Sequence, residues 1–493
     1  MVSLDPLRKA RTRLRASIPF LCATLMFALS GSRLVSAQPG VPTTTNATEV
    51  SSGGPPLGWN SWDSYGLTVT EAQVRDNAEA MRHKLAPAGW RYIVVDEGWY
   101  FSNPQDRPRP EALRYSMDES GRFLPAPLRF PSSTASLVKV DGASTIYANP
   151  TGLRSLGEWL HAQHLLFGIH IIRGIPREAV RMNLPIADSE FHARDAADTS
   201  DACPWDPTSW GVRDNAAGQA WYDSLLRQYA AWGIDFLKVD CISDHPYRPT
   251  EIRQIHNAIV KTGRPIVLSL SPGPTALEHA AEVKQYAQMW RISNDVWDVW
   301  SSHGDFPVSV RSQFARLAEW AKYAGPASWP DGDMLPFGEL RPHPDVGPGP
   351  RSSRLRPEEE RTQFTLWAFA RSPLILGANL TLLTPELQKM LDNRELLRVN
   401  QTATSSSEVL HDGDMIAWKA QTPQGPAWAL FNVGETPLSL RGSKNPFQIS
   451  GCKSLKDLWT GKKLKQRQST GEMIPPHGSL SYIAEPSSCA RRP

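Results

Sequence analysis

Between residues 55 and 395 the chain alternates short apolar segments with amphipathic ones, and this pattern restricts the possible folds more than any other feature of the sequence. The apolar segments have the length of buried strands, whereas the segments between them repeat apolar residues at helical spacing. Strands are predicted at 57–60, 92–96, 166–172, 236–240, 266–270, 289–292, 327–329 and 374–377. Eight strands that alternate with helices predict an α/β fold with a parallel sheet, and eight is the strand number of the closed (β/α)8 TIM barrel.

Amphipathic helices are predicted between these strands, at 70–85, 153–164, 216–232, 250–262, 277–286, 309–324 and 357–370. An open doubly wound sheet is the alternative. It would place a Gly-rich turn after the first strand, but the sequence there is Gly-Trp-Asn-Ser-Trp, at 58–62. Two long insertions, at 101–150 and 174–214, follow the second and third strands, on the side where barrel enzymes build their active sites.

Beyond residue 400 the apolar segments become shorter and several alternate in polarity, separated by Gly- and Pro-containing turns. This pattern is typical of antiparallel strands with one buried face. We therefore predict a catalytic barrel at 55–399 and a C-terminal antiparallel β-sandwich domain at 400–493. The strands of this second domain are predicted at 415–419, 427–432, 438–440, 447–449, 456–459 and 479–483.

The first 37 residues have the pattern of a secretory signal peptide. Basic residues from Lys9 to Arg15 precede an apolar stretch at 18–29, and Val-Ser-Ala at 35–37 offers a small-residue cleavage site. A retained membrane anchor is the alternative, although the apolar stretch is short for a membrane span. We expect a secreted or periplasmic protein with a flexible leader at 38–54 and no membrane association after cleavage.

The charge and the cysteines narrow the possibilities further. A formal net charge of +3 over 493 residues gives no indication of a nucleic-acid partner. Four cysteines remain after cleavage and allow three pairings, of which sequence proximity and the domain division favour Cys203 with Cys241 and Cys452 with Cys489. The His and Cys spacings do not suit zinc, so neither a metal nor another cofactor is predicted. The oligomeric state is not predicted.

The segment Lys238-Val239-Asp240 ends the fourth predicted strand with two charges on one face, because alternate residues of a strand point the same way. An ammonium beside a carboxylate lowers the pKa of that carboxylate and keeps it ionised. Asp240 could then act as a nucleophile. The alternative is a structural ion pair that caps a buried strand.

Polar residues also occur at the ends of the other predicted strands, and these ends would meet at one mouth of a barrel. The candidates are Asp96, Glu97, His170, Ser271, Arg291, Asp295 and Asp333. Two carboxylates that flank a bond are what glycoside hydrolysis needs, with Asp240 as nucleophile and Asp295 as acid and base. The remaining charged candidates, with Lys238, would hold sugar hydroxyls. Metal-assisted hydrolysis is disfavoured because His170 is the one histidine at these strand ends.

These motifs resemble, in the same order, those of the glycoside hydrolase family 27 α-galactosidases, or melibiases. The similar segments are the opening GWNSW motif with Trp62, the Asp-rich end of the second strand at 92–99, Lys238-Val239-Asp240, Arg291 to Asp295, the segment at 329–335 and the approach to the eighth strand at 360–374. The resemblance implies a retaining double displacement without a metal, with Asp240 and Asp295 as the catalytic pair. It also implies an α-linked galactose-type sugar, held by residues that include Trp62.

Two departures from the family pattern concern the sugar. Glu97 stands where the family has Asp, and its extra methylene would crowd the hydroxymethyl group of galactose, so β-L-arabinopyranose could fit better. Ser271 begins a run of small residues where animal-type α-galactosidases carry larger ones, as in the N-acetylgalactosaminidases. His170 replaces a Tyr, and it is kept among the substrate-binding candidates. The pair Cys203 and Cys241 matches a disulfide that the family often has beside the nucleophile.

The leading expectation is an exported, retaining exo-α-galactosidase that acts on an oligosaccharide or a polysaccharide side chain. The alternatives are a β-L-arabinopyranosidase and an α-N-acetylgalactosaminidase. A non-catalytic carbohydrate-binding barrel is a further alternative, but it would be expected to lack one of the two carboxylates.

Overall fold

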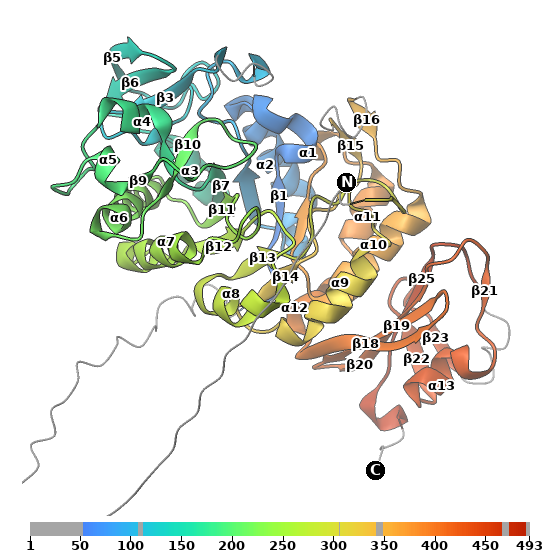
Figure 1. Ribbon diagram of the computed structural model, residues 1–493. Helices are drawn as coiled ribbons and strands as arrows, with labels where there is room; N and C mark the ends of the chain where they lie inside the picture. The colour runs from blue at the N-terminus through green and yellow to red at the C-terminus, as the bar shows by residue number, and fades with distance from the viewer. Residues whose placement is uncertain (1–52, 107–111, 305, 342–348, 466–472, 490–493) are drawn as a thin grey trace, which may run out of the picture. The chain divides into compact units, whose positions relative to one another are not determined.

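The computed structural model describes residues 53–106, 112–304, 306–341, 349–465 and 473–489 (Figure 1). The predicted signal peptide at 1–37 lies outside these ranges, as does the predicted leader at 38–54 apart from its last two residues. None of the helices within the described ranges has both the length and the apolar character that crossing a membrane requires.

An eight-stranded parallel sheet forms the barrel. Its strands are β1 (Leu57–Asn60), β2 (Tyr92–Val95), β7 (Leu166–Ile172), β11 (Phe236–Asp240), β12 (Val267–Leu270), β13 (Met289–Arg291), β14 (Trp329–Asp331) and β17 (Leu374–Leu376). From β1 to β14 each strand pairs with the next in this series, and β17 pairs with β1. The ring closes beyond β14, where Leu335 bridges to Leu376 and donates its N–H to the carbonyl of Ile375 at 2.8 Å. The predicted fold class is confirmed.

Seven of the barrel's helices lie close to their predicted positions. They are α2 (Glu71–Lys84), α3 (Arg154–Ala162), α6 (Ala216–Ala231), α7 (Pro249–Thr262), α8 (Ala280–Tyr286), α9 (Gln313–Trp320) and α10 (Pro357–Ala370). Local sequence sets their ends. Thr70 and Gln73 form a capping box at the start of α2, and Gly263, in the left-handed conformation, ends α7. The helix predicted at 309–324 is shorter, because a 3-10 turn at 321–323 follows α9.

The strand β14 differs from the prediction by two residues, because it spans Trp329–Asp331 instead of 327–329. Asp331 therefore lies inside the strand and not after it. The helix predicted at 277–286 begins with a 3-10 turn, Leu277–His279, before α8.

The insertions form small sheets of their own. The first contains β3 (Tyr115–Asp118), β4 (Phe123–Leu124), β5 (Ser136–Asp141) and β6 (Ser144–Ala148), in the order β4-β3-β6-β5. The second contains β8 (Ile175–Pro176), β9 (Ala197–Asp198) and β10 (Ser209–Val212), in the order β8-β10-β9. Further short elements are α1 (Trp62–Tyr65), α4 (Arg177–Met182), α5 (Ala193–Ala196), α11 (Pro385–Leu391), α12 (Arg394–Thr402), β15 (Glu339–Leu340) and β16 (Arg351–Ser352).

Side chains alternate between the two faces of each strand, so the face that points into the barrel carries both its apolar core and its charged residues. Phe236 belongs to a buried interior cluster with Val94, Val267, Met289 and Trp329. Lys238 and Asp240 follow on the same face of β11, because side chains of a strand alternate. The barrel interior is thus apolar at its base and charged at the carboxyl ends of the strands.

The C-terminal domain is built on a six-stranded antiparallel sheet of order β18-β19-β20-β25-β22-β23. Its strands are β18 (Ser405–Asp412), β19 (Met415–Thr422), β20 (Gly425–Asn432), β22 (Ser454–Asp457), β23 (Lys463–Lys465) and β25 (Ser479–Ile483), with a ribbon of β21 (Leu438–Ser439) and β24 (Met473–Ile474). One face, with Trp418 and Phe431, belongs to the same apolar cluster as the barrel helices. The other face, with Trp428 and Leu430, packs on the ribbon.

One predicted strand of this domain is wrong. Residues 447–449 lie in a short helix, α13 (Pro446–Ser450). Asn445 caps this helix by accepting from the N–H of Phe447, and Gly451 ends it in the left-handed conformation. These two signals outweigh the apolar character of the segment.

Candidate active site

A cavity of about 430 Å³ opens at the carboxyl ends of the barrel strands. Of the ten residues predicted for the site, nine line it: Trp62, Asp96, Glu97, Lys238, Asp240, Ser271, Arg291, Asp295 and Asp333. The tenth, His170, lies behind Asp240. The strand ends therefore converge as the sequence predicts, in a cavity of the size that binds small organic ligands.

Lys238 pairs with Asp96 and not, as expected from the sequence, with Asp240. Its Nζ donates to Oδ2 of Asp96 at 2.8 Å, and the side-chain amide of Asn60 donates to the same oxygen at 2.6 Å. Burial alone would raise the pKa of Asp96, but the charges of Lys238 and His170 outweigh it and hold that pKa well below its usual range. The carboxylate of Asp96 raises the pKa of Lys238 in turn, against its burial. This pair is a fixed, fully charged floor of the cavity.

His170 takes the place beside Asp240 that the sequence had suggested for Lys238. Its Nε2 lies 3.2 Å from Oδ2 of Asp240, and the N–H of Cys241 donates to Oδ1 at 2.7 Å. Burial raises the pKa of Asp240, but the hydrogen bond and charge of His170, with the charge of Lys238, bring it below its ordinary value. Burial lowers the pKa of His170, but the charge of Asp96 and the bond to Asp240 raise it overall. Asp240 is thus kept ionised, mainly by His170.

Arg291 pairs with two further carboxylates of the cavity, those of Asp295 and Asp333. Its Nη2 lies 3.1 Å from Oδ1 of Asp295 and 2.7 Å from Oδ2 of Asp333. Asp333 also accepts from the N–H of Val296 at 2.6 Å. Burial raises the pKa of Asp333, with the charges of Asp295 and Asp331 adding to it and that of Arg291 opposing it. Asp295 differs from its neighbours because 41% of its side chain is exposed to the cavity mouth.

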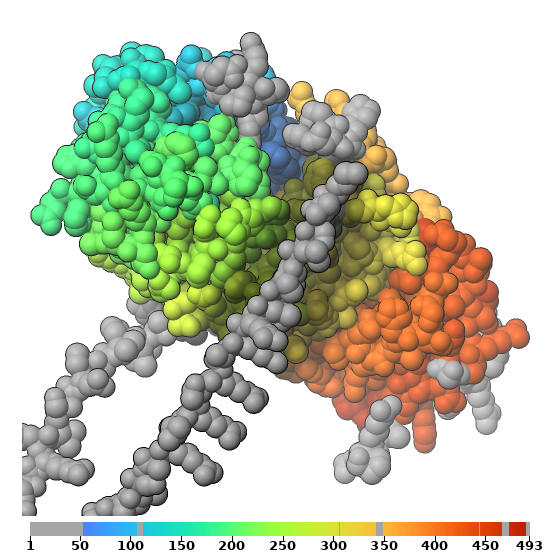
Figure 2. Space-filling view, viewed as in Figure 1, coloured from blue at the N-terminus to red at the C-terminus, as the bar shows by residue number. Residues whose placement is uncertain are grey.

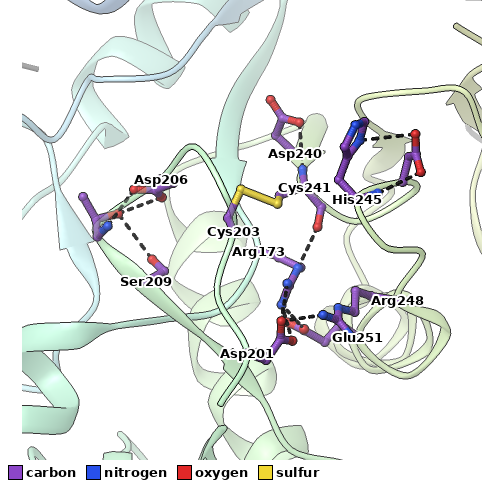
Figure 3. Close-up of a disulfide and its surroundings, with 12 residues drawn as sticks. Arg173, Asp201, Cys203, Asp206, Ser209, Asp240, Cys241, His245, Arg248 and Glu251 are labelled. Carbon is purple, nitrogen blue, oxygen red and sulfur yellow. Dashed lines mark hydrogen bonds and ion pairs between the residues drawn. A yellow bond between two sulfur atoms is a disulfide. The ribbon is translucent and has the colours of Figure 1, made fainter. Parts of the chain in front are cut away.

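The backbone that carries Asp240 is supported from below by Arg173 (Figure 3). The N–H of Arg173 donates to the carbonyl of Asp240 at 3.1 Å, and its Nε donates to the carbonyl of Cys241 at 2.6 Å. The guanidinium is buried and pairs with Asp201 at 2.9 Å and with Glu251 at 2.7 Å. This network fixes the main chain on both sides of the Asp240 peptide.

Both predicted disulfides are present. Cys203 bonds to Cys241, so the residue after Asp240 is tied covalently to the second insertion (Figure 3). Cys452 bonds to Cys489 within the C-terminal domain. In the part of the chain that the structure describes, no three His, Cys, Asp or Glu side chains gather as a metal site would require.

The residues that line the cavity without having been predicted include Asp63, Trp205, His245 and Phe306. Asp63 is buried, and burial with the nearby charges of Asp333 and Asp295 raises its pKa well above the usual range. Its position directly after the GWNSW motif was the available signal. The three rings lie on loops, where the sequence pattern does not determine direction. Trp205 could have been suspected because it follows Cys203 by two residues.

Known proteins share both the sequence and the arrangement. A sequence model of the α-galactosidase A family, Melibiase_2, matches residues 215–402. An α-galactosidase of Oryza sativa subsp. japonica is 24% identical over 440 residues, which cover 88% of this chain and 85% of the rice protein. The α-galactosidase A of Cellvibrio japonicus is 25% identical over 455 residues, with 88% and 92% covered.

A solved structure decides the family. The family 27 β-L-arabinopyranosidase of Geobacillus stearothermophilus is 36% identical, with a TM-score of 0.78, and the match covers 91% of this chain and 100% of that one. The chain belongs to glycoside hydrolase family 27. A family 27 member acts on carbohydrate, and a second structure of the same arabinopyranosidase is a complex with arabinose.

Another solved neighbour carries a different name. A protein of Bacillus halodurans C-125, provisionally named an α-N-acetylgalactosaminidase, is 35% identical with a TM-score of 0.73, and the match covers 88% of this chain and 97% of that one. The relatives of this chain are therefore named for three different sugars. The choice among these sugars has to come from the residues of this cavity.

Proposed function

We propose that the protein is a retaining exo-glycosidase that releases terminal β-L-arabinopyranose. The observation that carries the proposal is Glu97, which lines the cavity directly after Asp96. Asp96 is fixed by Lys238, and its Oδ1 accepts the N–H of Glu97 at 2.8 Å, so the start of the Glu97 side chain is fixed as well. The longer side chain then occupies space that the hydroxymethyl group of galactose would need. Arabinopyranose has the same ring configuration without that group.

The 36% identity to an arabinopyranosidase supports arabinopyranose over galactose, because the α-galactosidases of rice and Cellvibrio are 24% and 25% identical. It does not separate arabinopyranose from N-acetylgalactosamine, because the Bacillus halodurans protein is 35% identical. The α-galactosidase activity expected from the sequence remains the second candidate. It is favoured by the shared ring configuration of the two sugars. One methylene in a pocket changes selectivity by only about 10–200-fold, so some activity on galactosides is expected.

The chemistry follows from the two carboxylates. Asp240, kept ionised by His170, attacks the anomeric carbon while Asp295 gives its proton to the leaving oxygen. The bond from the anomeric carbon to the leaving oxygen breaks, and an ester to Asp240 forms. Asp295 then removes a proton from water, the water attacks the anomeric carbon, and Asp240 leaves with its electron pair. The exposed position of Asp295 allows the leaving group to depart and water to enter.

Three nitrophenyl glycosides test the proposal side by side: the β-L-arabinopyranoside, the α-D-galactoside and the α-N-acetyl-D-galactosaminide. The expected result is the highest kcat/KM on the arabinoside and a lower value on the galactoside. A higher kcat/KM on the galactosaminide would reject both candidate sugars. Absence of turnover on all three would reject the enzymatic function.

The variant Glu97→Asp tests the role of the side-chain length. Removing one methylene should raise the galactoside-to-arabinoside ratio of kcat/KM by roughly 10–200-fold. Glu97→Gln is the matched control, because it keeps the length and removes the charge. If the ratio moves in Glu97→Gln and not in Glu97→Asp, charge and not space selects the sugar.

We also propose export with cleavage after Ala37. Two disulfides fit an oxidising compartment. N-terminal sequencing of the mature protein from the producing cells should begin at Gln38. A mature chain that still begins at Met1 in the cytoplasm would contradict the proposal.

A further inference from the structure

The depth of the cavity orients the substrate. The residues that would hold the first sugar are the most buried: the side chain of Arg291 is 4% exposed and that of Asp333 is 7% exposed. Asp240 is 18% exposed, whereas Asp295 is 41% exposed. If Asp295 protonates the leaving oxygen, the leaving group must lie on its side of the sugar, toward the rim.

Three aromatic side chains form that rim: Trp205, His245 and Phe306. Trp205 follows Cys203 by two residues, and the disulfide partner of Cys203, Cys241, directly follows Asp240. The ring of Trp205 meets the ring of His245 edge to face, with centroids 5.4 Å apart. Phe306 lies in the loop that follows Asp295, and 42% of this residue is exposed. The rim therefore has one aromatic wall next to each of the two carboxylates.

The Trp205 wall is held by several local bonds. The disulfide from Cys203 to Cys241 lies two residues before Trp205. The residue after Trp205, Asp206, accepts from the N–H of Thr208 at 2.7 Å and from its hydroxyl at 2.8 Å. Figure 3 shows this short segment between the disulfide and Asp206, with His245 on the neighbouring loop. The wall is therefore set against the strand that carries Asp240.

The Phe306 wall is held by pairing within its own loop. The N–H of Val308 donates to the carbonyl of Asp295 at 2.8 Å, and the N–H of Trp297 donates to the carbonyl of Val308 at 3.1 Å. Val296 and Val308 also form a bridge. The end of the loop at Val308 therefore lies beside its beginning at Asp295, and Phe306 is two residues before Val308.

We propose that Trp205, His245 and Phe306 form a binding site for the leaving group, and that this group is itself a sugar ring. The apolar C–H face of a pyranose matches an aromatic face, whereas its hydroxyls can point to solvent at the open rim. The inference rests on the proposed exo-glycosidase function. The substrate is then an oligosaccharide or a glycan side chain in which the released sugar is linked to another sugar.

Two substrates separate the binding of the leaving group from the chemistry. One is a disaccharide that carries the preferred sugar, and the other is the fluoride of that same sugar, whose leaving group is too small to reach the rim. The quantity to measure is kcat/KM on the disaccharide divided by kcat/KM on the fluoride. This quotient reports contacts to the leaving group, because the first sugar is the same in both substrates.

Phe306→Ala and His245→Ala should each lower this quotient by roughly tenfold, since a well-packed aromatic contact is typically worth that much. Trp205→Ala should lower it further, and Trp205→Phe should restore part of the loss. Leu128→Ala is the control, because Leu128 is 96% exposed and does not line the cavity. A quotient unchanged in Phe306→Ala and His245→Ala would overturn the inference. Failure of the wild type to hydrolyse the fluoride would instead reject the proposed function.

Discussion

The two carboxylates that face the cavity are held in different ways. Asp240 is 18% exposed, accepts a backbone N–H and lies beside His170, on a main chain that Arg173 and a disulfide support. Asp295 is 41% exposed and receives a hydrogen bond from Arg291, at the start of a loop that folds back on itself.

The difference matches the two roles proposed for them. A nucleophile has to stay ionised and has to remain in place while the covalent bond forms and breaks. An acid and base has to exchange a proton twice, first with the leaving oxygen and then with water, so access to solvent is useful to it. The firmly held Asp240 therefore suits the role of nucleophile, and the more exposed Asp295 suits the role of acid and base.

The largest effect is expected for Asp240→Ala, because it removes the group that forms the covalent bond. We expect kcat/KM to fall by on the order of 10⁵-fold on every substrate, whatever the leaving group. Azide should restore turnover of the sugar fluoride and give a glycosyl azide of inverted configuration, detected by NMR. Activity within tenfold of the wild type would assign the nucleophile to another residue.

Asp295→Ala should lower kcat/KM by about 10²–10⁴-fold on a disaccharide, because the leaving oxygen then departs without a proton. The loss should be much smaller on the sugar fluoride, which needs little protonation. Azide should here give the product of retained configuration. A loss as large on the fluoride as on the disaccharide would remove the distinction between the two carboxylates.

His170→Phe tests the origin of the ionised state of Asp240. His170 lowers the pKa of Asp240, so its removal should raise that pKa. The acidic limb of the kcat/KM profile should then move to higher pH, and the rate at the optimum should fall by roughly tenfold.

The matched variant is His170→Gln, which keeps a donor near Oδ2 of Asp240 and should recover much of the acidic limb. If both variants keep the acidic limb of the wild type, Lys238 and the backbone must hold Asp240 ionised without His170.

The smallest effect on activity is expected from the disulfides, which offer a comparison of two nearly equal loops. Cysteines 203 and 241 are 38 residues apart, and cysteines 452 and 489 are 37 apart. Replacing either pair with Ala should lower the free energy of unfolding by about 4 kcal/mol, by loop-closure entropy. Only the first pair should also lower kcat/KM, by severalfold, because it adjoins Asp240. Calorimetry on both double variants measures the loss of stability, and kinetics measures the loss of kcat/KM. An equal loss of kcat/KM in both variants would show that the first pair has no specific role in the site.

The barrel could be predicted from sequence because each of its strands is an apolar run between polar turns. The C-terminal domain was harder to predict. β18 is an exposed, Ser-rich edge strand, so its residues carry no strong apolar signal. Residues 447–449 carry such a signal but form a helix, because Asn445 and Gly451 cap them.

The same contrast applies to the site. Strand-end residues such as Arg291 could be predicted, because parallel strands bring their carboxyl ends together. The partner of Lys238 could not be predicted, since it is Asp96, directly after β2, a strand separated from β11 by β7. Spacing along one strand suggested Asp240, whereas packing across the barrel interior selected Asp96. Phe306 and His245 lie on loops whose paths depend on hydrogen bonds far from any periodic pattern.

The burial of α10 bears on how freely the two parts of this enzyme could be exchanged in evolution or by engineering. Its residues from Thr362 to Ala370 are all buried, and it contacts β18, β19, β20 and β25. Thr362 donates to the carbonyl of His477 at 2.7 Å, and Phe314 of α9 meets Phe431 edge to face. In the space-filling view the surface of the barrel, coloured from blue to yellow, adjoins the surface of the β-domain, coloured orange and red (Figure 2). A barrel cut off from its β-domain would expose this helix to water. The β-domain is therefore no interchangeable module, and a fusion partner should be attached behind it and not in its place.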